Sequence, residues 1–229
     1  MFWENLVFDA KMPHEHGKYW EKLLSSETLT DNEGGFETRL RFSPERYLDL
    51  CFPLVSNPEP HAQRVFPLLS AADKNVALEV EGVKLAREER VDIAGRGYLT
   101  SRDPTQTPAT TRLAGVELHS AEPERDAKFW AMLTGFHRSN SVPTVITHPS
   151  GIGPVIMLVH ETTPKSAAKS SVHLDLRLEA RDDINQILNV IQEHGGTELK
   201  HEWGTVPWRV FLDPSGNEFC ILPALAEDA

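Results

Sequence analysis

The chain has 229 residues, of which 40% are hydrophobic and 25% charged, values typical of a soluble globular protein with one large or two ordinary domains. Its formal net charge of −11 argues against nucleic acid as a partner, because phosphate backbones are bound mainly by clustered Lys and Arg. No apolar stretch approaches the ~20 residues that span a bilayer, so we expect no membrane partner and a cytoplasmic location. The two cysteines, Cys51 and Cys220, are far apart and indicate neither a disulfide framework nor a thiolate zinc site.

The first half of the chain reads as a strand, a helix and three strand-like runs. We expect these elements at residues 6–10, 13–25, 27–30, 36–42 and 47–55. Tyr19 and Trp20 recur on the apolar face of the helix. His14 and His16 lie two positions apart, where helical side chains do not face each other, and we interpret both as surface residues.

The second half repeats this order of elements. We expect strands at residues 116–119, 142–147, 154–159, 172–178, 208–212 and 218–222, with helices at 123–134 and 182–194. Gly135 and Gly195 are typical of positions that follow the last turn of a helix. Asp182 or Asp183 is expected to cap the start of the last helix.

The run at residues 172–178 is the most informative in the chain. Its strict alternation places the side chains of His173, Asp175 and Arg177 on one face of a strand and aliphatic side chains on the other. His, Asp and Arg can coordinate, titrate and pair with an anion. A solvated sheet face remains the alternative interpretation.

A fixed offset indicates that the chain contains a duplication. Trp20 and Trp130 are 110 positions apart, and Asp103 and Asp213 share that spacing. The polar, proline-containing stretch at residues 105–112, shortly after Asp103, is typical of a linker. We predict an N-terminal domain at residues 1–104, a linker at 105–112 and a C-terminal domain at 113–229.

Three motifs together resemble the vicinal oxygen chelate superfamily, which contains glyoxalase I, bleomycin-resistance proteins and extradiol dioxygenases. They are Phe-Trp-Ala-Met-Leu-Thr-Gly-Phe at 129–136, Val-His-Leu-Asp-Leu at 172–176 and Asp-Pro-Ser-Gly-Asn-Glu-Phe-Cys-Ile-Leu at 213–222. The resemblance implies an α+β fold of tandem strand-helix-three-strand units. Two glyoxalase-like domains, the first one degenerate, would each have an eight-stranded half-open sheet that forms a cup. Whether the two domains pack face to face or share strands is left open.

The resemblance also implies positions for metal ligands, in the first and last strands of each unit. They fall on His173 and Cys220 in the last unit, with Glu218 two residues before Cys220 on the same strand face. In the preceding unit they fall on Gly115, which has no side chain, and near Met157. The first-strand position of the N-terminal half falls on Asn5. Because this set is incomplete for a divalent metal, we expect a cup without metal and without another cofactor.

Period-two alternation extends the expected lining of the cup. If Gly115 faces the cup, Glu117 and His119 do so as well, and the space above Gly115 could accommodate a ligand. Trp203 and Trp208 flank the last hairpin and could provide flat walls for a planar molecule. Trp20 and Trp130, on helix faces, are expected to pack in the core. We predict that His173 and Glu218 are catalytic if the cup is an active site, and that the following residues contact a ligand: Glu117, His119, Asp175, Arg177, Trp203, Trp208 and Cys220.

The leading hypothesis is that the protein binds a small aromatic or polyoxygenated molecule in a metal-free cup, as drug-sequestering members of the superfamily do. The alternative is a lyase, isomerase or dioxygenase-like enzyme in which His173 acts with Asp175 or Glu218, or within an irregular metal site. In a third interpretation, the N-terminal half is mainly a packing partner that replaces a second subunit. The expected assembly is a monomer or a homodimer.

Overall fold

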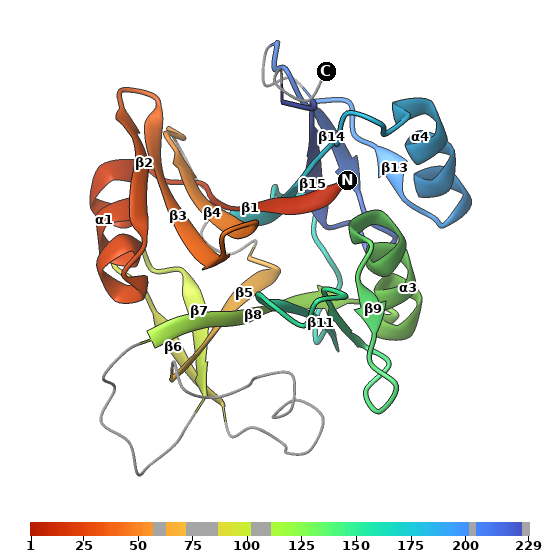
Figure 1. Cartoon of the computed structure of the whole chain (residues 1–229), viewed down its shortest axis with the longest axis horizontal. Coiled ribbons are helices and arrows are strands. Elements are labelled where there is room, and N and C mark those ends of the chain that lie inside the picture. Colours follow the sequence, from red (N-terminus) through yellow and green to blue (C-terminus); the bar gives the residue numbers. More distant parts are fainter. Residues whose placement is uncertain (57–62, 72–86, 102–110, 202–204, 226–229) are drawn as a thin grey trace.

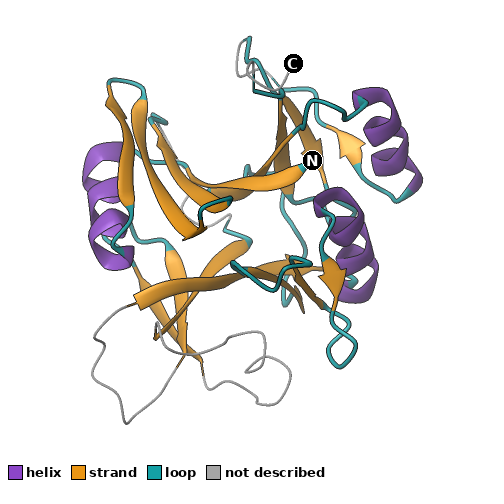
Figure 2. Cartoon of the chain, in the orientation of Figure 1, coloured by secondary structure: helices purple, strands orange, loops and turns teal. Residues whose placement is uncertain are grey.

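The computed structural model describes residues 1–56, 63–71, 87–101, 111–201 and 205–225. In these residues, two large sheets form the centre of the molecule and helices lie along its flanks (Figure 1, Figure 2). The helices are α1 (Pro13–Leu24), α3 (Pro123–Thr134) and α4 (Ile184–Glu193). The α+β class, the tandem units and the two cupped sheets that the sequence predicted are confirmed. None of the described helices is long and apolar enough to cross a membrane.

The first sheet has eight described strands and contains both ends of the chain. In sheet order they are β13 (Thr197–Glu198), β14 (Arg209–Leu212), β15 (Glu218–Leu222), β12 (Val172–Arg177), β1 (Phe2–Phe8), β4 (Arg46–Pro53), β3 (Gly35–Ser43) and β2 (Glu27–Asn32). The junction is an antiparallel pairing of β1 with β12, in which Leu6 lies opposite Leu174. The first and last quarters of the chain therefore build one continuous sheet.

The second sheet has seven described strands from the middle of the chain. In sheet order they are β6 (Arg87–Val91), β7 (Gly97–Ser101), β5 (Val65–Ala71), β8 (Thr111–Ser120), β11 (Val155–His160), β10 (Val145–Thr147) and β9 (His137–Arg138). Its junction is the antiparallel pair β5 and β8. The two halves of the chain thus share strands in both sheets, which answers the question that the sequence left open. The domain boundaries stay a prediction: residues 105–110 lie outside the described residues, and Thr111 and Arg112 already belong to β8.

One apolar core connects both sheets and the helices. Trp20 of α1 and Trp130 of α3 are fully buried in it, which confirms their predicted packing role. Asp183 caps α4 as expected, because its side chain accepts a hydrogen bond from the Asn185 backbone amide. His14 is exposed as predicted, but the surface interpretation of His16 is wrong: this side chain is 1% exposed and hydrogen-bonds to the Asp92 carboxylate.

A tight turn occurs twice, but not at the offset that the sequence suggested. Asp213 accepts hydrogen bonds from the amides of Ser215 and Asn217, and Gly216 has a left-handed φ of 81°. Asp92 makes the same bonds with the amides of Ala94 and Arg96, around Gly95 with a φ of 75°. The counterpart of Asp213 is therefore Asp92, because the turn requires a glycine three residues after the aspartate. Asp103, the predicted counterpart, lacks such a glycine and lies outside the described residues.

Candidate functional site

A cavity of about 800 Å³ lies on the face of the eight-stranded sheet that is opposite the apolar core. We call it the cup. Its lining comes from both ends of the chain: β1, β2, β3 and β4 of the N-terminal half and β12, β15 and the segment before β14 of the C-terminal half. The N-terminal half thus forms part of the cup wall and is not only a packing partner.

The floor of the cup is formed by β12, as the alternation in the sequence predicted. Val172, Leu174 and Leu176 enter the core on one face of the strand. His173, Asp175 and Arg177 line the cup on the other. The floor is buried as well, since His173 and Asp175 are each 7% exposed. The interpretation of this face as a solvated surface is therefore wrong.

His173 and Asp175 lie against each other but leave polar atoms without partners. His173 Nε2 is 3.3 Å from Asp175 Oδ1, and Asn5 Nδ2 donates a long 3.4 Å bond to Asp175 Oδ2. His173 Nδ1 and Asp175 Oδ1 are buried and have no hydrogen bond of good geometry. Such atoms are costly in a folded protein and are typical of sites that bind something.

Cys220 completes a cluster of potential ligands. It lies opposite Asp175 in the β12–β15 pairing, and donor atoms of His173, Asp175 and Cys220 all lie within 4.8 Å of one another. Burial and the neighbouring Asp175 carboxylate raise the pKa of the Cys220 thiol well above its usual value. The thiol is therefore protonated at neutral pH unless a cation replaces its proton.

The donor set of this cluster suits one kind of metal better than others. The sequence provided two donors, His173 and Cys220, and the structure adds Asp175 as the third. Three mixed nitrogen, oxygen and sulfur ligands fit a catalytic zinc site, in which a fourth position stays open. Magnesium, calcium and manganese prefer mostly oxygen ligands. The cluster thus fits zinc, and it would hold the ion through His173 Nε2 or Nδ1, an Asp175 oxygen and the Cys220 thiolate.

The cations of the cup wall are already engaged in ion pairs. Arg177 binds the Glu4 carboxylate through Nε at 2.6 Å, and its Nη1 donates to the Pro223 carbonyl. Lys169 Nζ lies 2.5 Å from Asp9 Oδ2. The predicted cup residue Arg177 is thus present, but its charge is neutralised by a residue that the sequence did not indicate.

Part of the cup lining is apolar. It includes Pro207, Trp208 and Leu222 from the C-terminal half and Pro53 and Leu54 from the N-terminal half, and Trp208 is 36% exposed. The predicted wall residue Trp208 therefore lines the cup. Trp203, the second predicted wall residue, lies outside the described residues.

Glu218 does not line the cup, although it is on the same strand face as Cys220. Its carboxylate accepts a 3.0 Å bond from Lys165 Nζ and a 3.3 Å bond from the Ser170 backbone amide. Lys165 and Ser170 belong to the segment that leads into β12. Glu218 is thus engaged in an ion pair and is not among the residues that line the cup.

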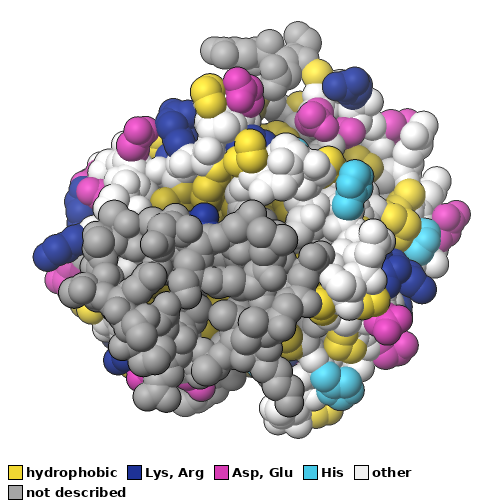
Figure 3. Space-filling model, turned by 60° about the horizontal axis from the view of Figure 1, so that its bottom comes forward, with side chains coloured by type: hydrophobic (Ala, Val, Ile, Leu, Met, Phe, Trp, Pro, Cys, Tyr) yellow, Lys and Arg dark blue, Asp and Glu magenta, His cyan; other side chains and the backbone are white. Residues whose placement is uncertain are grey.

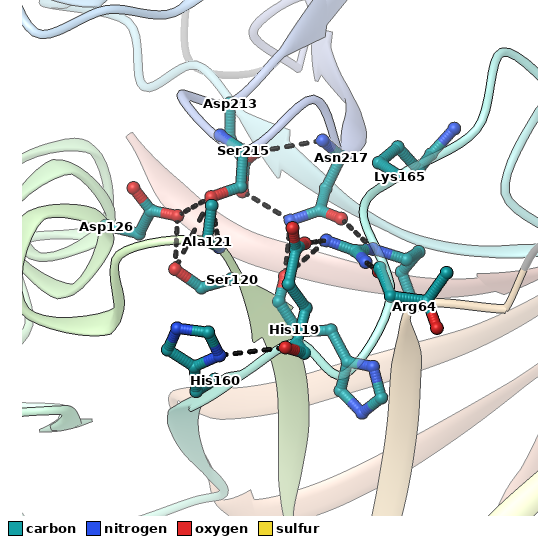
Figure 4. Close-up of polar contacts among 12 residues, drawn as sticks. Arg64, His119, Ser120, Ala121, Asp126, His160, Lys165, Asp213, Ser215 and Asn217 are labelled. Atoms are coloured by element: carbon teal, nitrogen blue, oxygen red, sulfur yellow. Dashed lines mark hydrogen bonds and ion pairs between the residues drawn. The ribbon is translucent and has the colours of Figure 1, made fainter.

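Glu117 and His119 lie on β8 in the other sheet and not at the cup. The His119 ring stacks on Phe66 with centroids 4.9 Å apart, and its backbone carbonyl accepts bonds from Arg64 and Asn217 (Figure 4). Burial, followed by the positive charge of Arg64, lowers the pKa of His119. These two residues are part of the second sheet, which the sequence did not separate from the first.

Gly115 provides no room for a ligand. A Cβ on this residue would lie 2.6 Å from the Val155 carbonyl oxygen and 2.7 Å from Val155 Cγ2. The glycine is needed because β8 and β11 approach each other closely at this point. The predicted space above Gly115 is therefore occupied by the neighbouring strand.

Three cup residues were not assigned to the cup from the sequence. Glu37 and Cys51 lie on β3 and β4, which are paired so that the two residues are opposite each other, and Asp9 follows β1. Cys51 was interpreted as a small buried hydrophobe. Burial, and then the charges of Glu37 and Asp175, raise its pKa well above the usual value. The period-two pattern of β3 was visible, but which of its faces belongs to the cup depends on strand pairing.

Comparisons with known proteins agree with this architecture. Residues 115–222 match a family model described as a glyoxalase-like domain. A variant of glyoxalase I from Zea mays is 16% identical with a TM-score of 0.59, over 97% of this chain and 93% of the other. A protein from Bacillus subtilis described as a candidate dioxygenase is 15% identical with a TM-score of 0.54, over 97% of this chain and 85% of the other. At these identities the structures show a shared fold, and a comparison with curated proteins gave no match.

Proposed function

We propose that the chain binds a small organic molecule in the cup, because residues 115–222 match the model of a glyoxalase-like domain and the chain shares its fold with a variant of glyoxalase I. The observation that carries this proposal is the cavity of about 800 Å³ with a polar floor and apolar walls. Small-molecule sites are typically concave, largely apolar and furnished with a few convergent polar groups.

The buried floor favours binding over simple packing. His173 Nδ1 and Asp175 Oδ1 have no partner of good geometry, although each is out of reach of bulk water. A ligand with hydrogen-bond donors and acceptors would satisfy both atoms. Trp208 and Leu222 would cover its apolar body, and no metal is needed for this role.

The proposal can be tested with two variants that fill different hollows. A second cavity, of about 680 Å³, lies between α3, α4 and the β3–β4 turn and is lined in part by Val190. A library of small aromatic and polyoxygenated compounds is screened by saturation-transfer NMR against the full chain. Binders should be lost in Leu222→Trp, which fills the cup, and kept in Val190→Trp, which fills the second cavity. Trp208→Ala is a milder test if Leu222→Trp does not fold.

Two results would contradict binding in the cup. Binders that survive Leu222→Trp and Trp208→Ala but disappear in Val190→Trp would place the binding site between the helices. A library without any binder that depends on the cup would also count against the proposal. In that case the cup would have no role in small-molecule recognition.

A second candidate function is supported by the three-donor cluster. In it, His173, Asp175 and Cys220 hold zinc, and the protein is a lyase, isomerase or dioxygenase-like enzyme. Bound zinc would supply Lewis-acid polarisation of substrate oxygens. Elemental mass spectrometry of protein purified without chelator separates the two candidates. Stoichiometric zinc that is lost in His173→Ala but kept in His194→Ala, a control at an exposed residue directly after α4, supports the enzyme. Zinc far below stoichiometry, unchanged after incubation with zinc salt, supports metal-free binding.

A further inference from the structure

We infer that the molecule bound in the cup carries a positive charge, as an organic ammonium or guanidinium ion with an apolar body. This inference rests on the proposed function and names the class of ligand for the same cavity. It follows from which charges on the cup wall are paired and which are not. The residues concerned come from four strands that the two ends of the chain bring together.

The basic side chains on the wall are each matched by a carboxylate. Arg177 is paired with Glu4, and Lys169 with Asp9. Arg39, two residues after Glu37 on β3, does not line the cup and is held by both oxygens of Asp49 at 2.7 Å. These pairs contribute no net charge to the cavity.

Two carboxylates of the wall, Glu37 and Asp175, form no ion pair with a Lys or Arg of the described residues. Glu37 accepts one hydrogen bond, from the Thr30 hydroxyl at 2.9 Å. Asp175 is bonded by the neutral amide of Asn5 and otherwise faces the His173 ring. Both side chains line the cup. With the Lys and Arg side chains of the wall already paired, these two carboxylates leave an excess of negative charge in the cavity, which is costly in a buried environment without a compensating cation.

The Cys51 thiol, which also lines the cup, is consistent with this excess of negative charge. After burial, the groups that raise the pKa of Cys51 most are Glu37 and Asp175, from two different strands.

The remaining walls suit the apolar part of such a ligand. Trp208, which is partly exposed, lines the cup together with Pro207 and Leu222. An aromatic face attracts organic cations as well as apolar groups. A cation on a flat apolar body would therefore contact Glu37 or Asp175 with its charge and Trp208 with its body.

Three probes with one skeleton test the inference. Tryptamine, 3-ethylindole and indole-3-propionate share an indole ring with a short side chain that is cationic, neutral or anionic. Dissociation constants are measured by NMR titration of the full chain. We expect tryptamine to bind about tenfold more tightly than 3-ethylindole, since one charge contact at a partly buried site is commonly worth that factor, and indole-3-propionate to bind most weakly.

Conservative variants then assign the preference to residues. Glu37→Gln and Asp175→Asn should each reduce the affinity for tryptamine about tenfold and leave that for 3-ethylindole unchanged. The matched control is Glu27→Gln on the neighbouring strand β2, an exposed residue that does not line the cup. It should change neither affinity.

The outcomes distinguish this inference from the proposed function. If 3-ethylindole or indole-3-propionate binds as tightly as tryptamine, and that binding is lost in Leu222→Trp, the cup binds molecules but has no preference for cations. A tryptamine preference that survives both Glu37→Gln and Asp175→Asn would also overturn the inference. If no probe shows binding that depends on Leu222, the proposed function itself fails.

Discussion

The indole Nε1 of Trp20 donates a 2.9 Å hydrogen bond to Asp92 Oδ2, and Trp130 makes the same contact with Asp213 at 3.1 Å. Each contact joins the first helix of one half of the chain to the tight turn of its last hairpin. Only the N-terminal copy adds a buried histidine, His16, to the aspartate. The two halves therefore share a structural contact whose electrostatic surroundings differ.

Trp20→Phe should destabilise the protein by about 1–3 kcal/mol, because the Asp92 carboxylate loses a buried donor while the aromatic packing is largely kept. Trp130→Phe should have an effect of similar size at Asp213. Chemical unfolding followed by circular dichroism measures both. Trp208→Phe, at a residue that is 36% exposed, is the control and should change stability little; an equal loss in all three variants would show that the hydrogen bonds are not responsible.

The two aspartates should give opposite dependences of stability on pH. Burial raises the pKa of Asp213 to about 6 from an ordinary value of 3.8. The folded state therefore holds this proton more tightly, so the contribution of Asp213 to stability is complete below pH 3.8 and is lost as the pH rises towards 6. For Asp92, burial raises the pKa, but His16 and the donors around it outweigh that effect and lower it. Its contribution is present above pH 3.8 and is lost in more acidic solution.

The measurement is the free energy of unfolding of the wild type and of Asp213→Asn between about pH 6 and about pH 4. On acidification across this window, the wild type should gain about 1 kcal/mol per pH unit relative to the variant, because one pKa unit corresponds to about that energy. Parallel curves for the two proteins would mean that the pKa of Asp213 is not raised in the folded state.

Gly115→Ala should destabilise the protein by about 2–4 kcal/mol. The new methyl group would meet the Val155 backbone at 2.6 Å, and a strand backbone cannot give way as a flexible side chain can. Gly34→Ala is the control, because its Cβ would meet no atom closer than 3.3 Å. A Gly115→Ala protein as stable as the wild type would revive the interpretation of this position as open space.

Arg64 holds the end of the second sheet to the last hairpin, because its Nε donates to the Asn217 side chain (Figure 4). The same guanidinium pairs with the Glu161 carboxylate, directly after β11. Arg64→Met should cost about 3–5 kcal/mol, since it leaves the nearly buried Glu161 without its partner. Adding Glu161→Gln should recover part of that loss. A double variant as unstable as the sum of the single variants would show that the two side chains do not interact.

The sequence predicted most of the local structure because local signals determine it. The apolar stripe and the aspartate cap located α4, and strict alternation located the floor of the cup at His173 and Asp175. Whether a strand pairs with its sequence neighbour or with one from the other end of the chain is decided by tertiary packing. The pairing of β1 with β12 therefore could not be predicted, and with it the contributions of Asp9, Glu37 and Cys51 to the cup.

The errors have physical causes of the same kind. Glu218 was assigned to the cup from its strand face, but Lys165, distant in sequence, covers it. Glu117 and His119 were placed with His173 because each half of the chain was expected to form its own cup.

On the lower face of the molecule, the basic side chains among the described residues are scattered rather than gathered in one patch (Figure 3).

The most direct measurement is a crystal structure of the full chain with the tightest-binding indole probe. We expect this probe to be tryptamine, bound in the cup with its ammonium group within hydrogen-bond distance of Asp175 or Glu37 and its ring against Trp208. A probe seated in the cavity between α3 and α4, or a cup with no bound molecule at a saturating concentration of the probe, would contradict it.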